Sequence, residues 1–218
     1  MQPDFWRDRW RAGQIGFHQP AVDRNLEASW QTLDLRKGAR VFVPLCGKSL
    51  DMLWLRDRGH AVCGVELSDI ALQAFCMENG IPARRRAAAG VDSYVAPGLE
   101  LLCGDIFALT APALGKVDAI YDRAALVSFA PQVRTRYVEQ LIALTPGRPV
   151  TLLITLEYPQ LQMAGPPFSV TTPEIGRLYG PAHDIVEIDR RDVTATEHRM
   201  RARGVTRITE VCYQLVRR

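Results

Sequence analysis

The N-terminal part of the chain contains an amphipathic segment at helical spacing. After Pro20, apolar side chains recur every three or four residues, and proline is well tolerated in the first turn of a helix. The pattern predicts an amphipathic helix over residues 20–33, with an apolar face formed by Val22, Leu26, Trp30 and Leu33.

Short apolar runs further along the chain predict strands that are covered on both faces. These runs lack the alternation of polar and apolar residues that half-exposed strands show. Ser68 is a good N-cap for one of the intervening helices. Strands that are separated by helices pair in parallel, so we expect a doubly wound, mostly parallel α/β sheet. The predicted strands are residues 40–46, 61–66, 99–103, 117–121 and 150–156, and the predicted helices are residues 49–58, 68–79 and 131–144.

The last third of the chain changes character. Residues 159–172 are predicted to form a loop and residues 173–179 a short helix. Two further strands, near residues 184–190 and 207–216, indicate an antiparallel edge or hairpin. Because the chain shows neither a linker nor an internal repeat, we expect residues 1–218 to form one domain.

Composition narrows the class of protein. With 47% hydrophobic and 23% charged residues, the sequence is typical of a soluble globular protein. It contains neither an apolar run of about 20 residues nor an N-terminal apolar segment of the signal-peptide type. Its five cysteines are scattered without a C-x-x-C pair, so we expect no zinc site and a cytoplasmic location.

The turn after the first strand contains Gly47-Lys48-Ser49, as a phosphate-binding loop does. Such a loop also needs a glycine five positions before Gly47, where this chain has Phe42 within the predicted strand. The G-x-G-x-x-G fingerprint of dinucleotide-binding proteins is absent too, which argues against a nicotinamide dehydrogenase. What remains is a single glycine at a tight turn, where a ligand can approach the backbone.

Acidic residues follow the next strands. Glu66 lies 21 residues after Leu45, where a carboxylate can accept hydrogen bonds from the ribose of a ligand held over the first turn. Alternatively, Glu66 complements the dipole of the helix that starts after Ser68. Asp105 and the pair Asp122-Arg123 add polar groups to the same rim, and together these residues favour a nucleoside ligand.

Other chemistries have little support in the sequence. There is no G-x-S-x-G elbow, the four histidines lack metal-site spacing, and the net charge of +3 comes without a broad basic face for nucleic acid. Trp6 and Trp10 lie four residues apart, so that their rings either cover a cofactor or anchor an N-terminal helix to the core.

Taken together, several motifs resemble thiopurine S-methyltransferases of the bacterial type. They are the W-x-x-x-W pattern that leads to Gly16-Phe17-His18, VPLCGKSLDM at residues 43–52, DRGHAVCGVELS at residues 57–68, CGDIF at residues 103–107 and DRAAL at residues 122–126. The resemblance implies a class I, S-adenosylmethionine-dependent methyltransferase. It also implies a Rossmann-like sheet of seven strands, mostly parallel, with an antiparallel C-terminal strand.

Matching positions give the residues that the resemblance implies for the site. Arg123 and Arg199 would act on the substrate, which Phe17 would also contact, although Arg201 and Arg203 leave the register of Arg199 open. Residues 1–35 would form a helical cover over the cofactor. The implied S-adenosylmethionine site consists of Trp6, Trp10, Leu45, Gly47, Glu66, Leu67, Asp105, Ile106 and Arg123.

The implied reaction is an in-line methyl transfer to the sulfur of a small aromatic or heterocyclic thiol. Arg123 would favour the thiolate by charge, so that no dedicated general base is needed. We expect a monomer without a nucleic-acid or membrane partner. Methylation of selenium or tellurium species, or of another small metabolite, is an alternative, as is a nucleoside-binding module without turnover. The loop at residues 160–171 either forms part of the substrate rim or is an ordinary surface loop.

Overall fold

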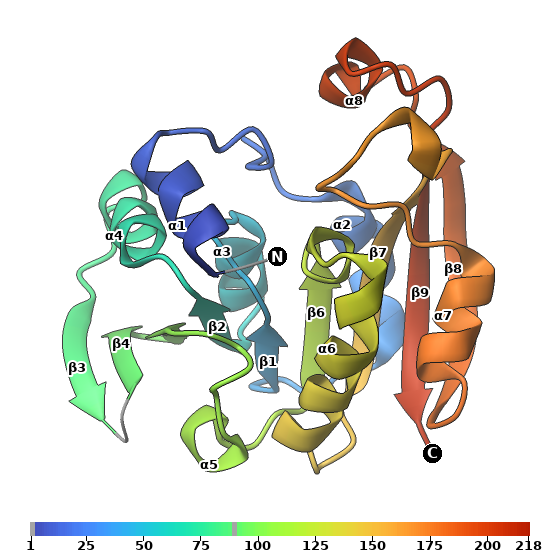
Figure 1. Cartoon of the computed structure of the whole chain (residues 1–218). Helices are drawn as coiled ribbons and strands as arrows, with labels where there is room; N and C mark the ends of the chain where they lie inside the picture. Colours follow the sequence, from blue (N-terminus) through green and yellow to red (C-terminus); the bar gives the residue numbers. More distant parts are fainter. Residues whose placement is uncertain (1–2, 89–90) are drawn as a thin grey trace.

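A computed structural model of the chain describes residues 3–88 and 91–218. Within these residues, nine strands form one twisted sheet in the order β3-β4-β5-β2-β1-β6-β7-β9-β8 (Figure 1). Five of them pair in parallel in the middle of the sheet, as the alternation of strands and helices predicts. These are β1 (Arg40–Val43), β2 (Ala61–Glu66), β5 (Leu99–Cys103), β6 (Ala119–Arg123) and β7 (Val150–Glu157).

The C-terminal edge of the sheet is antiparallel. Strand β9 (Thr209–Arg217) lies between β7 and β8 (His183–Asp192) and runs opposite to both. Seven neighbouring strands, in the order β5-β2-β1-β6-β7-β9-β8, therefore form the mostly parallel sheet with an antiparallel C-terminal strand that the resemblance implied. Because Leu156 near the end of β7 pairs with Glu210 near the start of β9, β9 begins at the edge where the parallel strands end.

A hairpin extends the other edge of the sheet. Strands β3 (Arg84–Ala88) and β4 (Val91–Ala96) pair with each other, and β4 pairs with β5, all in antiparallel fashion. The sequence analysis did not predict this hairpin. The pattern does not reveal this hairpin because β3 carries three arginines at the exposed edge, and only Ser93 and Tyr94 of β4 are buried.

The helices follow the predicted order with shifted ends. Helix α2 (Arg24–Ser29) begins four residues after Pro20, because the Asp23 carboxylate caps it by accepting from the backbone N–H of Asn25 at 2.9 Å. The 3₁₀ turn η1 (Trp30–Leu33) continues it. Two short helices that the sequence did not indicate are α5 (Ala111–Leu114) and α8 (His198–Ala202). The remaining helices are α1 (Pro3–Arg11), α3 (Asp51–Asp57), α4 (Asp69–Glu78), α6 (Pro131–Leu144) and α7 (Thr172–Tyr179).

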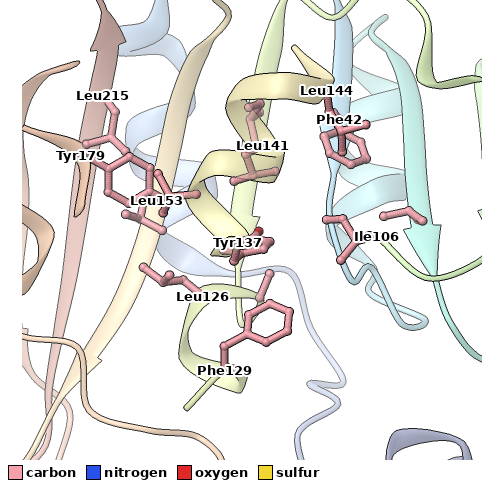
Figure 2. Close-up of a cluster of buried hydrophobic side chains, with 14 of the residues drawn as sticks. Phe42, Ile106, Leu126, Phe129, Tyr137, Leu141, Leu144, Leu153, Tyr179 and Leu215 are labelled. Carbon is pink, nitrogen blue, oxygen red and sulfur yellow. The ribbon is translucent and has the colours of Figure 1, made fainter. Parts of the chain in front are cut away.

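Hydrophobic cores lie on both faces of the sheet. Phe42 of β1 points into the core beneath α6, where Tyr137 and Leu141 are fully or almost fully buried (Figure 2). Its neighbours Val41 and Val43 point to the opposite core, beneath α2, α3 and α4. This explains why the strand sequence lacks alternation. None of the helices within the described residues is long and apolar enough to cross a membrane.

Candidate functional site

A cavity of about 990 Å³ lies at the edge where the parallel strands end. Segments from the whole length of the chain line it, from α1 at the N-terminus to β9 at the C-terminus. The structure thus brings together all the residues that the resemblance implied for the site, and their roles in binding remain predictions. These residues are Trp6, Trp10, Phe17, Leu45, Gly47, Glu66, Leu67, Asp105, Ile106, Arg123 and Arg199.

Glu66 is buried at the end of β2, and backbone groups hold both of its oxygens. Its Oε2 accepts from the N–H of Gly47 at 3.0 Å, and its Oε1 accepts from the N–H of Ser68 at 2.8 Å. Burial raises the pKa of Glu66, and these backbone donors partly oppose that rise. Ser68 caps α4, so the two sequence interpretations of Glu66 are compatible: the carboxylate lies at a helix N-terminus and also lines the cavity.

The turn between β1 and α3 has a left-handed backbone at two positions, with φ of +48° at Leu45 and +52° at Gly47. A Cβ atom on Gly47 would lie 3.4 Å from the indole ring of Trp10. Trp10 is buried and lines the cavity, so glycine lets this ring lie directly on the turn. Left-handed backbone at a non-glycine residue such as Leu45 is uncommon and concentrates at functional sites.

Aromatic residues near the N-terminus form a cluster over one side of the cavity. The rings of Trp6 and Trp10 both meet Phe17 edge to face, with centroids 5.4 and 5.6 Å apart. Across the cavity, the guanidinium of Arg199 lies against Gly16, where an added Cβ would come within 2.8 Å of Nη1. The N-terminal segment and α8 therefore meet above the site.

The end of β5 provides an apolar surface beside a carboxylate. Asp105 accepts from the backbone N–H of Phe107 through Oδ1 at 2.9 Å. The ring of Phe107 packs against that of Phe129 with centroids 5.5 Å apart, and the guanidinium of Arg136 lies 4.3 Å from the centre of the Phe107 ring. Sequence reasoning missed Phe129 and Arg136, because only the fold brings them next to Asp105.

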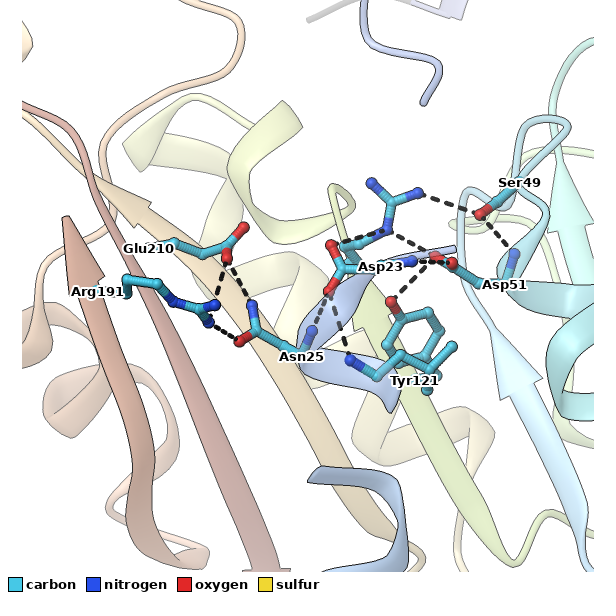
Figure 3. Close-up of polar contacts among 9 residues, drawn as sticks. Asp23, Asn25, Ser49, Asp51, Tyr121, Arg191 and Glu210 are labelled. Carbon is cyan, nitrogen blue, oxygen red and sulfur yellow. Dashed lines mark hydrogen bonds and ion pairs between the residues drawn. The ribbon is translucent and has the colours of Figure 1, made fainter. Parts of the chain in front are cut away.

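Arg123 is fixed in the middle of the cavity by buried acids. Its Nε donates to Asp51 Oδ2 at 2.7 Å and lies 4.0 Å from Asp23 Oδ2, while Nη2 donates to Ser49 Oγ at 3.1 Å. Figure 3 shows this network, in which the hydroxyl of Tyr121 also donates to Asp51 at 3.0 Å. No hydrogen bond involves Nη1 of Arg123 within residues 3–88 and 91–218, so this nitrogen is available to a ligand.

Two further polar residues from the sequence analysis do not face a ligand freely. Asp122 is fully buried on the other face of β6, where it accepts from the hydroxyl of Tyr137 at 2.7 Å and from the N–H of Leu126 at 3.2 Å. The expectation that it adds to the rim is therefore wrong, because successive residues of a strand point to opposite faces. Lys48 lines the cavity and pairs with Glu78 at 2.7 Å.

The far end of the cavity is formed by α8, the start of β9 and the loop after β7. Arg199 and Arg203 line it, whereas Arg201 is not one of the lining residues. Of the three arginines that the sequence left open for the substrate side, Arg199 and Arg203 therefore remain. Arg203 also donates to the carbonyl of Pro166 at 3.2 Å, and residues 165–167 line the cavity. The loop at residues 160–171 thus contributes to the wall at this end. Glu197 and Glu210 line the same region and were missed by the sequence analysis.

Comparison with known proteins settles the family. The sequence profile of the thiopurine S-methyltransferases matches residues 1–218. The chain belongs to the thiopurine S-methyltransferase family. A thiopurine S-methyltransferase of Methylococcus capsulatus is 49% identical over 216 residues, which cover 99% of this chain and 97% of that protein. That of Nitrosospira multiformis is 44% identical over 218 residues, covering 100% of this chain and 99% of that protein. The resemblance noted from the motifs is therefore confirmed.

Solved structures of methyltransferases share the fold of this thiopurine S-methyltransferase family member. The magnesium protoporphyrin IX methyltransferase of Synechocystis, solved with bound S-adenosylhomocysteine, superposes with a TM-score of 0.65 at 13% identity and 100% coverage of both chains. A Burkholderia thailandensis 1,6-didemethyltoxoflavin N1-methyltransferase, also solved with S-adenosylhomocysteine, gives a TM-score of 0.64 at 16% identity, covering 97% of this chain and 86% of that chain. These likenesses confirm the class I methyltransferase fold.

Proposed function

We propose that this protein transfers the methyl group of S-adenosylmethionine to the sulfur of a small heteroaromatic thiol, with thiopurines as the substrate class. Membership of the thiopurine S-methyltransferase family supports this reaction. The observation that carries the proposal is the buried Glu66 carboxylate, held by Gly47 and Ser68, at a cavity that reaches to Arg123 and Arg199.

The residues at one end of the cavity fit S-adenosylmethionine. The carboxylate of Glu66 is a suitable acceptor for the two ribose hydroxyls. Ile106, Phe107 and Phe129 offer apolar surface for a purine ring, and Asp105 offers an acceptor for its amino group. A cavity of about 990 Å³ is at the upper end of the range for ligand pockets, so it has room for the cofactor and a small acceptor together.

When bound, S-adenosylmethionine supplies a methyl group on a positively charged sulfur. The protein's contribution is to hold the acceptor sulfur in line with that methyl group and to keep water out. Trp6, Trp10 and Phe17 provide an apolar wall beside the site. We assign the exclusion of water to these rings and, more generally, the role of a cover to residues 1–35.

Arg123 orients the acceptor and favours its thiolate form. Asp51 and Ser49 hold the guanidinium in place, so that little reorganisation is needed when a negative sulfur approaches. Burial lowers the pKa of Arg123, but the nearby carboxylates of Asp51 and Asp23 help to raise it overall, which keeps the group charged in the cavity. Arg199 supplies a second positive charge from the far end. No general base is required, because a heteroaromatic thiol is already acidic.

Two measurements test this function. Calorimetry with S-adenosylmethionine measures binding, and an assay with a labelled methyl donor measures transfer to a thiopurine, to thiophenol and to a selenol. The proposal predicts binding together with transfer to the thiopurine sulfur. Binding without transfer to any acceptor would instead support a nucleoside-binding module, and transfer to the selenol alone would support selenium methylation.

We further propose that the protein acts as a monomer in the cytoplasm. One chain supplies both the proposed cofactor end and the proposed acceptor end of the cavity, so the proposed reaction needs no second copy. The five cysteines are free, and four of them are buried, which suits a reducing compartment. Size-exclusion chromatography with light scattering, and fractionation of the source cells, test the two parts of this proposal.

A further inference from the structure

Glu210 has a fixed orientation at the end of the cavity that is opposite to Glu66. Its side chain is only 14% exposed, and its Oε1 accepts from Asn25 Nδ2 at 2.6 Å and lies 4.0 Å from Arg191 Nη2 (Figure 3). Asn25 is buried, and its Oδ1 accepts from Arg191. Since Arg191 can only donate, the amide of Asn25 must turn its NH₂ group toward Glu210.

The other oxygen of Glu210 is free to accept. Among the described residues, Oε2 has no hydrogen-bond partner and is not one of the atoms buried away from solvent. Glu210 is one of the residues that line the cavity, and an oxygen open to solvent there is available to a ligand. The carboxylate therefore presents one fixed acceptor atom to whatever occupies this end of the cavity.

The topology places Glu210 at the acceptor end. Strand β9 is four neighbours away from β2 in the sheet, through β1, β6 and β7. At roughly 4.8 Å per strand, the axes of β2 and β9, which carry Glu66 and Glu210, lie about 19 Å apart. Arg123 on β6 lies between the two, so a thiol that reaches Arg123 extends its ring toward Glu210.

We propose that Glu210 determines acceptor specificity by accepting a hydrogen bond from a ring N–H of a heteroaromatic thiol. This inference rests on the proposed methyl transfer and adds the means by which the acceptor ring is recognised. Arg199 and Arg203 supply donors at the same end, so the pocket offers both donors and an acceptor, as a nitrogen heterocycle requires. A benzenoid thiol has no ring N–H and leaves Oε2 without a partner.

The electrostatic environment of Glu210 supports this role. Burial, followed by the nearby charge of Asp23, raises the pKa of its carboxyl, whereas Asn25 and Arg191 oppose the rise. A carboxylate that has already lost much of its water gains more from a ligand N–H than an exposed one does. Glu197 is the other acid close enough to contribute.

The substitution Glu210→Gln tests the inference sharply. Asn25 Nδ2 still needs an acceptor, so the amide oxygen of the new side chain will take that place and its NH₂ group will face the cavity. The acceptor atom is thereby replaced by a donor of nearly the same size. We expect kcat/KM for 6-mercaptopurine, which carries ring N–H groups, to fall about tenfold or more through KM. The kcat/KM for thiophenol should change by less than roughly twofold.

The controls separate this role from charge and folding. Glu27→Gln removes the same charge from an exposed position of α2, the helix that carries Asn25. It should leave kcat/KM unchanged for both thiols. Glu210→Asp keeps the charge but withdraws the oxygen by one methylene. It should lower kcat/KM for 6-mercaptopurine and leave that for thiophenol unchanged. Turnover of thiophenol shows that each variant is folded.

The results distinguish the inference from the proposed function. Equal losses for both thiols in Glu210→Gln and Glu210→Asp, or no loss for either, would overturn the role of Glu210. Absence of turnover by the unmodified protein with both thiols would contradict the proposed function instead. In that case, calorimetry of 6-mercaptopurine binding in the presence of S-adenosylhomocysteine still tests the role of Glu210. Binding about tenfold weaker in Glu210→Gln than in the unmodified protein supports the inference, and equal binding overturns it.

Discussion

At the scale of single residues, the site depends on charges that are held in place before any ligand arrives. Arg123 contacts Asp51 and Ser49, and Glu66 contacts two backbone N–H groups. Such preorganised groups stabilise charge better than water does, because they need not reorient during the reaction. The sequence pointed to Arg123 and Glu66, but Asp51 and Ser49 are seen only once the β1–α3 turn has folded against β6.

Replacement of Arg123 should therefore affect the acceptor thiol most. In Arg123→Ala, loss of the guanidinium should lower kcat/KM for the thiol by about 100-fold, and Arg123→Lys should recover only part of this, because an ammonium lacks the fork that meets Asp51 and Ser49 together. Steady-state kinetics with thiol and cofactor varied separately measure the effect. Arg177→Lys, at an exposed position on α7, serves as control. Unchanged values for the thiol in both Arg123 variants would remove Arg123 from the mechanism.

The glycine at position 47 permits both a left-handed backbone and close contact with Trp10. Gly47→Ala should lower the free energy of unfolding by about 1–2 kcal/mol. It should also weaken binding of S-adenosylhomocysteine, because the new methyl group would lie against the Trp10 ring and take up space that glycine leaves open at the turn. Gly38→Ala is the matched control: its φ is +76°, but a Cβ atom there meets nothing within 4 Å. Urea unfolding and calorimetry measure the two effects, and equal cofactor binding by both variants would argue against the Trp10 contact.

At the scale of elements, β6 shows how one strand serves both the core and the site. Arg123 points into the cavity, whereas the preceding residue, Asp122, points into the core beneath α6 and contacts Tyr137. Burial raises the pKa of Asp122 to about 6. A carboxyl with a raised folded-state pKa stabilises the fold fully below its unfolded pKa of about 4, and loses this contribution as the pH rises through about 6.

The substitution Asp122→Asn should accordingly gain stability relative to the unmodified protein as the pH rises. Across the window from about pH 4 to pH 6, the difference in the free energy of unfolding between the two proteins should shift by about 2–3 kcal/mol in favour of the asparagine. Urea unfolding of both proteins at several pH values measures this difference. The other titrating groups are the same in the two proteins, so their contributions cancel. A difference that stays constant with pH would contradict the raised pKa.

Sequence patterns predicted the middle of the sheet and its C-terminal edge, and missed the hairpin at the other edge and the short helix α8. Strand β2 and the capped helix α4 were predicted closely, because buried apolar runs and the Ser68 cap leave clear signals. The β3–β4 hairpin and α8 were missed, since few of their side chains are buried. Helix α2 starts later than predicted because the Asp23 cap, rather than Pro20, sets its first turn.

At the scale of the whole molecule, the cavity is assembled from segments that are far apart in the sequence. The N-terminal rings, the ends of the parallel strands and α8 with the start of β9 all line it, so its acceptor end could not be found by reading motifs one at a time. Glu210, for example, reaches the site only because β9 inserts between β7 and β8 in antiparallel orientation. The family resemblance implied the cofactor end and, at the acceptor end, Phe17, Arg123 and Arg199, whereas Glu210 was found only from the fold.

A crystal structure of the protein with S-adenosylhomocysteine and a thiopurine tests the central claim most directly. Our account predicts both ribose hydroxyls within hydrogen-bond distance of Glu66 and the thiopurine sulfur on the side of Arg123. An adenosyl group bound away from the β1–α3 turn, or a ribose that leaves Glu66 without contact, would contradict it.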